Sequence, residues 1–146
     1  MKPSRILVLF FLMIAVVPCF AHHMAVVVNK DNHVADVAPA QLARICRLEA
    51  RKWPDGKDVT VVLHKDSPGE LATLEHLTHM SESEFKAFVL SHKDSLTLAD
   101  SEADVLRIVE TTPGAVGLVD VRSINDQVNV LRVGGKLPME DGYLSH

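Results

Sequence analysis

Cysteine is scarce in this chain of 146 residues, which contains only two. Cys19 lies in the N-terminal segment, so Cys46 has no partner in the rest of the chain. This excludes a small fold held together by internal disulfides and requires a hydrophobic core instead. Because Leu42, Ile45 and Cys46 fall on one face of a predicted helix, we expect Cys46 to be a buried structural thiol.

No hydrophobic run is long enough to cross a membrane as a helix, which takes about 20 apolar residues. The apolar run Ile6–Val17 has twelve residues; it follows a short basic start and ends before Pro18 and a small-x-small triplet. This order is typical of a secretory signal peptide. The sequence therefore predicts a signal peptide over residues 1–21, cleaved near Ala21, and a periplasmic or secreted product with no membrane span.

Basic residues are fewer than acidic residues: the chain has 15 Lys and Arg against 19 Asp and Glu, which gives a formal net charge of −4. Loss of Lys2 and Arg5 with the signal peptide would bring the charge to about −6. A domain of this sign does not favour nucleic acid or an anionic membrane as a partner. The predicted partner is a small solute or another protein.

Catalytic motifs are also missing: there is no nucleophile elbow, no Gly-rich phosphate loop and no pair of carboxylates at a distinctive turn. We therefore interpret the chain as a non-enzyme and predict no cofactor. The sequence also lacks a repeat of 20 to 50 residues, which excludes a repeat architecture.

What the chain does contain is a series of short apolar strands alternating with helices. The predicted strands are 25–29, 59–63, 115–119 and 128–133, and the predicted helices begin at Pro39, Pro68, Glu82 and Glu102. Such alternation is typical of an α/β layered domain. About 125 residues after cleavage is the usual size of one domain.

The clearest local signal is the start of the helix at residue 68. Ser67 can act as the N-cap, Pro68 occupies the first helical position, and Glu70 stands where the glutamate of a capping box belongs. We therefore expect Ser67 and Glu70 to satisfy each other's backbone amides.

The order of these pieces resembles the type 2 periplasmic solute-binding proteins, in particular the phosphate-binding branch and its small single-lobe relatives. The segments that carry the resemblance are 26–29, the helix 40–48 with the Trp53-Pro54-Asp55-Gly56 turn, the turn 64–69, and Pro113-Gly114-Ala115-Val116-Gly117-Leu118-Val119. The resemblance implies a single three-layer lobe with a mixed, mainly parallel sheet flanked by helices. Larger members of the family close two such lobes around the solute, and this chain is similar to the second.

The resemblance also implies a ligand-binding site at a strand-to-helix turn, where backbone N–H groups and the helix dipole suit an anion. The candidate residues are Asn29, His64, Lys65, Asp66, Ser67 and Gly69. Three positions depart from the pattern of the larger phosphate binders: His64 replaces an arginine, Pro68 removes an amide donor, and Glu70 adds a carboxylate. We therefore predict a non-enzymatic binding module for a small anion such as phosphate, with an altered or weakened site.

Two alternatives stay open. In the first, the ligand site has decayed and the lobe binds a protein partner or a second copy of itself. In the second, His22 becomes the N-terminal residue and binds copper through its amine and imidazole groups. His76 and His79 share a helix face but supply only two ligands, so we predict no metal site there.

Overall fold

The computed structural model describes residues 23–144. The predicted signal peptide over residues 1–21, its cleavage site near Ala21 and the copper ligand His22 lie outside this range. They stay predictions.

A five-stranded sheet with the order β4-β3-β5-β1-β6 forms the centre of the domain. Its strands are β1 (Met24–Asn29), β3 (Thr60–His64), β4 (Leu96–Ala99), β5 (Ala115–Asp120) and β6 (Val128–Val130). β3 runs parallel to β4 and β5, whereas β1 runs antiparallel to β5 and β6. Four strands therefore point one way and β1 points the other, which confirms the mixed, mainly parallel sheet.

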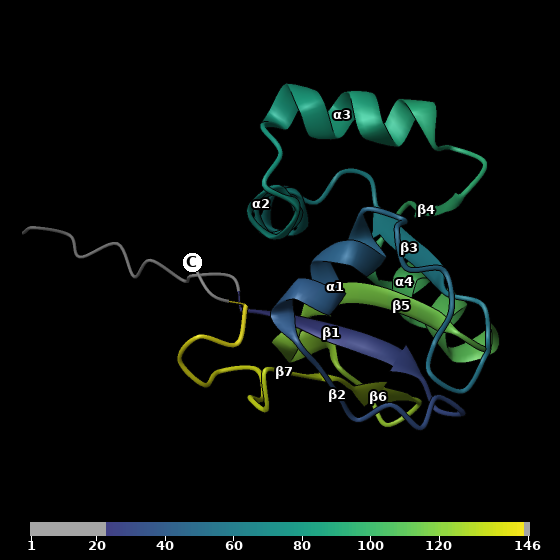
Figure 1. The fold of residues 1–146 in the computed structure, drawn as a ribbon. Coiled ribbons are helices and arrows are strands. Elements are labelled where there is room, and N and C mark those ends of the chain that lie inside the picture. Colours follow the sequence, from purple (N-terminus) through teal and green to yellow (C-terminus); the bar gives the residue numbers. More distant parts are fainter. Residues whose placement is uncertain (1–22, 145–146) are drawn as a thin grey trace, which may run out of the picture.

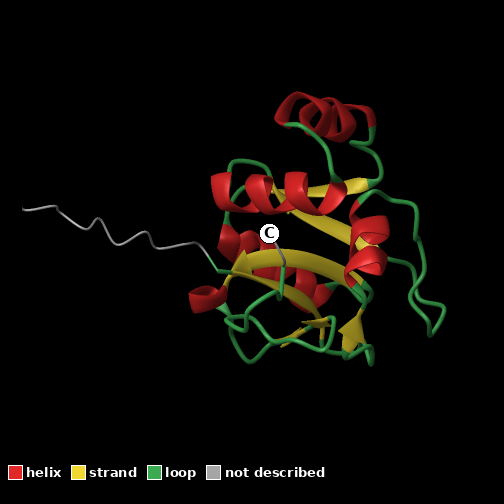
Figure 2. Cartoon of the chain, turned by 60° about the vertical axis from the view of Figure 1, so that its left-hand side comes forward, coloured by secondary structure: helices red, strands yellow, loops and turns green. Residues whose placement is uncertain are grey.

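Helices cover both faces of this sheet and give the domain three layers (Figures 1 and 2). One face carries α1 (Pro39–Cys46), α2 (Pro68–Thr78) and α3 (Glu82–Ser91), and the other carries α4 (Glu102–Thr111). In β1, Val26 and Val28 pack in the cluster under α1 and α2, while Val27 packs in the cluster under α4. A strand buried on both faces reads as an unbroken apolar run, and the β1 sequence does.

The predicted strand 128–133 is wrong as one element, because it is divided between two sheets. β7 (Arg132–Val133) leaves β6 and pairs in parallel with β2 (Asp36–Val37). At the break, Leu131 is fully buried, and its carbonyl accepts a hydrogen bond of 2.6 Å from the Tyr143 hydroxyl. The same hydroxyl accepts a hydrogen bond from the Val26 amide at 3.1 Å. The strand therefore divides where a buried tyrosine from the distant C-terminal segment inserts.

The Trp-Pro-Asp-Gly turn (53–56) contacts the Pro-Gly-Ala-Val-Gly segment (113–117). We call this contact between Trp53 and Gly114 the joint. Trp53 Nε1 donates to the Gly114 carbonyl at 2.8 Å. Gly114 has a φ of +82°, and a Cβ atom there would lie 2.0 Å from the Asp58 carbonyl oxygen. Only glycine fits this position. The joint lies where β3 and β5 begin, at the opposite edge of the sheet from His64.

Candidate anion-binding site

Two helices begin at the same edge of the sheet. β3 and β4 are parallel neighbours, so they end together, and each leads directly into a helix: α2 after β3 and α4 after β4. Ser67 caps α2 by accepting from the Glu70 amide at 3.3 Å, and Ser101 caps α4 by accepting from the Asp104 amide at 3.1 Å. Helix N-termini carry free N–H groups and a partial positive charge, which suit an anion.

A cavity of about 300 Å³, which we call the polar cavity, opens at this edge. Its lining consists of Met24, His64, Ser67, Pro68, Gly69, Glu102, Asp120 and Arg122. Three of the predicted site residues, His64, Ser67 and Gly69, are therefore brought together. The sequence analysis did not predict Glu102, Asp120 and Arg122. The end of the strand 115–119 could have indicated Asp120 and Arg122, because ligands of α/β sheets gather where strands end.

Lys65 and Asp66 belong to the same turn but lie outside the lining of the polar cavity. The Lys65 ammonium forms an ion pair of 2.7 Å with Asp100, at the end of β4. The hydrogen bond and the opposite charge raise the pKa of Lys65 and lower the pKa of Asp100. Asp66 is exposed. Lys65 thus has a carboxylate partner outside the polar cavity.

Asn29 does not join the other predicted site residues. Because β1 is antiparallel to β5, the end of β1 lies at the opposite edge of the sheet from His64. The Asn29 amide group donates to the carbonyls of Val109 at 2.8 Å and Glu110 at 3.0 Å. Asn29 therefore secures the last turn of α4, which is a structural role.

The charges in the polar cavity are largely paired with one another. Arg122 donates to both carboxylate oxygens of Asp120, at 3.0 Å and 2.9 Å. Glu102 accepts from the Asp120 amide and from the Ser123 hydroxyl, the latter at 2.9 Å. An anion entering the cavity must therefore share Arg122 with Asp120, and it meets two carboxylates nearby.

The first turn of α2 leaves one backbone donor for a ligand. The first four amides of an α-helix have no partner within the helix. Here Pro68 has no N–H, the Glu70 amide binds the Ser67 hydroxyl, and the Leu71 amide binds the Ser67 carbonyl at 3.0 Å. That leaves the Gly69 amide, in a residue that lines the polar cavity.

Glu70 does not form the expected capping box. One of its oxygens accepts from the His64 amide at 3.0 Å, while the Ser67 amide binds the His64 carbonyl instead. The side chain is folded inward and only 1% exposed. Burial raises the pKa of Glu70 to about 8, although the hydrogen bond from the His64 amide opposes this rise. The carboxyl group is therefore part of the core.

Cys46 packs against the core on the α1 face, and burial raises the pKa of its thiol to about 12. The residue as a whole is of intermediate exposure. Residues 23–144 contain no group of three or more His, Cys, Asp or Glu side chains placed to hold a metal ion. In the same range, no helix combines the length and the apolar character needed to cross a membrane.

The chain is similar in sequence and in fold to known phosphate-binding proteins. The sequence is 30% identical over 122 residues to the phosphate-binding protein PstS of Bacillus subtilis, a match that covers 79% of this chain. The fold is that of one lobe of such a protein. A phosphate-binding protein of Stenotrophomonas maltophilia superposes with a TM-score of 0.66 at 20% identity, covering 80% of this chain and 40% of its own. No family model matches the sequence.

Two further solved structures agree with this fold. The phosphate transport receptor of Vibrio cholerae gives a TM-score of 0.65 at 20% identity, over 80% of this chain and 48% of its own. A phosphate ABC transporter substrate-binding protein of Clostridium perfringens, solved with bound phosphate, gives 0.64 at 20% identity, over 77% of this chain and 45% of its own. This chain spans only 37% of the length of PstS. The resemblance to phosphate-binding proteins is thus confirmed for less than half of their length.

Proposed function

We propose that this chain is a non-enzymatic, periplasmic or secreted solute-binding module whose polar cavity binds an oxyanion such as phosphate. Residues 22–146 would form its single domain after removal of the signal peptide. The observation that carries the proposal is the convergence of the Gly69 amide, Arg122 and the N-termini of α2 and α4 on one cavity. The similarity to phosphate-binding proteins supports phosphate as the first ligand to test.

The binding we propose is weak. Arg122 is held by Asp120, Pro68 supplies no amide, and Glu102 adds negative charge to the lining. The polar cavity also opens to water, where screening weakens charge interactions. A dissociation constant of about 1 mM corresponds to only about 4 kcal/mol of binding free energy, and we expect an affinity in that range.

Isothermal titration of phosphate into the purified protein and two arginine variants tests this proposal. Arg122→Gln removes the only guanidinium group in the lining of the polar cavity, whereas Arg132→Gln removes an exposed arginine in β7. We expect the affinity for phosphate to fall about fivefold or more in Arg122→Gln, because charge-assisted hydrogen bonds are lost, and to stay unchanged in Arg132→Gln.

Equal loss in both variants would mean that phosphate responds only to net charge, and the proposed site would be wrong. Complete absence of phosphate binding would also contradict it. If such a non-binding chain eluted as a dimer from a gel-filtration column, the result would support the alternative of a protein-interaction module.

A further inference from the structure

A second cavity lies between α3 and the rest of the domain, and its lining is mostly apolar. This apolar cavity has a volume of about 270 Å³. It is lined by Leu63, His64, Lys65, Leu71, Leu74, Phe85, Lys86, Val89, Leu90 and Leu98, which come from β3 and the turn after it, α2, α3 and β4. In Figure 1, α3 stands apart from the sheet, above α2 and β4. Phe85 is its one buried residue, so α3 covers the cavity without filling it.

The size and lining of this cavity suit an apolar guest. A cavity of about 150 Å³ lined by apolar side chains stays dry and takes up benzene. The apolar cavity is larger, so it has room for an alkyl chain of medium length. At its border Leu90 is 64% exposed and Leu98 is 37% exposed, so apolar surface continues from the cavity to the solvent. A guest can therefore enter from outside without crossing a polar barrier.

The charged groups in the lining all have the same sign. Lys65 and Lys86 are basic, and the lining contains no carboxylate. The ammonium of Lys86 pairs with Glu82 at 2.8 Å, and that of Lys65 pairs with Asp100 at 2.7 Å. Both pairs are exposed, and exposed ion pairs contribute little stability. An incoming anion can therefore exchange with these partners at low cost.

We propose that the apolar cavity binds an amphiphilic anion: a medium-length alkyl chain enters between α2 and α3, and its carboxylate lies near Lys86 and Lys65. This site is distinct from the polar cavity, since His64 is the only residue that lines both. The inference therefore goes beyond the proposed function and does not depend on phosphate binding.

Titration of dodecanoate, below the concentration at which it forms micelles, tests the position of the alkyl chain. Val89→Trp fills the apolar cavity from α3, and Leu137→Trp places the same side chain at an exposed apolar position elsewhere. We expect saturable binding of one dodecanoate, at least tenfold weaker in Val89→Trp and unchanged in Leu137→Trp. A cooperative thermal transition in both variants confirms that they fold.

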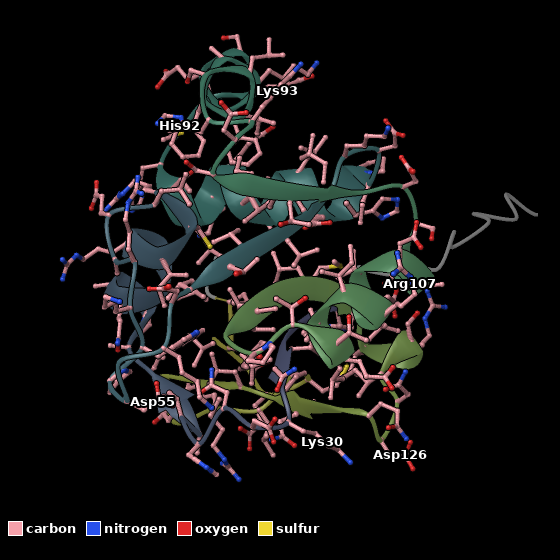
Figure 3. The ribbon with its side chains drawn as sticks, turned by 90° about the vertical axis from the view of Figure 1, so that its right-hand side faces the viewer. Lys30, Asp55, His92, Lys93, Arg107 and Asp126 are labelled. Carbon is pink, nitrogen blue, oxygen red and sulfur yellow. The ribbon has the colours of Figure 1, made fainter. Side chains whose placement is uncertain are left out.

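The position of the carboxylate is tested by charge reversal. Lys86→Glu reverses a lysine of the lining, and Lys93→Glu makes the same change just past α3, beside His92 (Figure 3). We expect Lys86→Glu to weaken dodecanoate binding severalfold and Lys93→Glu to leave it unchanged. We also expect dodecanoate to bind more tightly than dodecyltrimethylammonium, which has the same tail and a cationic head.

Absence of saturable binding, or equal binding in the unsubstituted protein and Val89→Trp, would overturn the proposal. Equal effects of Lys86→Glu and Lys93→Glu, or tighter binding of the cationic amphiphile, would overturn the assignment of an anionic ligand. Arg122→Gln separates the two sites, because we expect it to bind dodecanoate normally whether or not it binds phosphate.

Discussion

Glu70 shows how one residue changes role between the sequence pattern and the folded chain. Its position three residues after Ser67 is that of a capping-box glutamate, yet its carboxyl group faces the core and binds the His64 amide. The pattern predicts correctly where α2 begins, because Ser67 does cap the helix. It cannot predict the direction of the Glu70 side chain, which depends on the neighbouring strand β3.

The buried carboxyl group of Glu70 should make stability depend on pH. Its pKa is raised from an ordinary 4.5 to about 8, so the folded state binds more protons than the unfolded state between these values. The free energy of unfolding therefore falls as pH rises from about 4.5 to 8. In Glu70→Gln we expect this fall to be smaller by roughly a few kcal/mol, as measured by urea denaturation at pH 5 and pH 8.5. If the unfolding free energy fell equally between pH 5 and pH 8.5 in the unsubstituted protein and in Glu70→Gln, another group would be responsible.

The family resemblance predicts an arginine at position 64, where this chain has His64. Because His64 is among the residues that line the polar cavity, His64→Arg should add a permanent charge with two donors there. We expect an increase in phosphate affinity of roughly tenfold, measured by calorimetry. His33→Arg adds the same charge at an exposed position, and an equal increase there would contradict a specific effect.

At the scale of elements, the strands and helices that depend on local sequence could be predicted, and those that depend on distant contacts could not. β1, α3, α4 and β5 begin close to the predicted residues, because their apolar runs and serine caps are local signals. β2 and β4 were missed, since two and four residues carry too weak a pattern. The antiparallel direction of β1, which separates Asn29 from the site, is set by pairing with β5 more than 80 residues later.

The joint between Trp53 and Gly114 gives a test of element packing with a matched control. Gly114 and Gly56 both have positive φ values, of +82° and +88°. A Cβ atom at Gly114 would collide with the Asp58 carbonyl, whereas one at Gly56 meets nothing within 4 Å. We expect Gly56→Ala to cost about 1 kcal/mol of unfolding free energy from backbone strain alone, and Gly114→Ala to cost about 3 kcal/mol or more. Equal urea midpoints for Gly56→Ala and Gly114→Ala would show that the collision of the new Cβ atom with the Asp58 carbonyl is relieved without loss of stability.

At the scale of the whole molecule, the domain has the fold of one lobe, with the contact of Trp53 and Gly114 and the polar cavity at opposite edges of the sheet. The segments that carry the family resemblance most clearly, around Trp53 and Gly114, form the edge where β3 and β5 begin. The polar cavity lies at the other edge, where these strands end. We therefore relate the first set of residues to the fold, and we propose that the chemistry of the second set determines which ligand binds.

The most direct test is to map phosphate binding onto the backbone amides by two-dimensional NMR of the isotope-labelled protein. We expect saturable shifts at Gly69, Ser101 and Arg122, which lie at the edge with the polar cavity, and none at Asn29 or Gly114 at the opposite edge. Shifts confined to the edge of Asn29 and Gly114, or no saturable shift at Gly69, would contradict an anion-binding lobe.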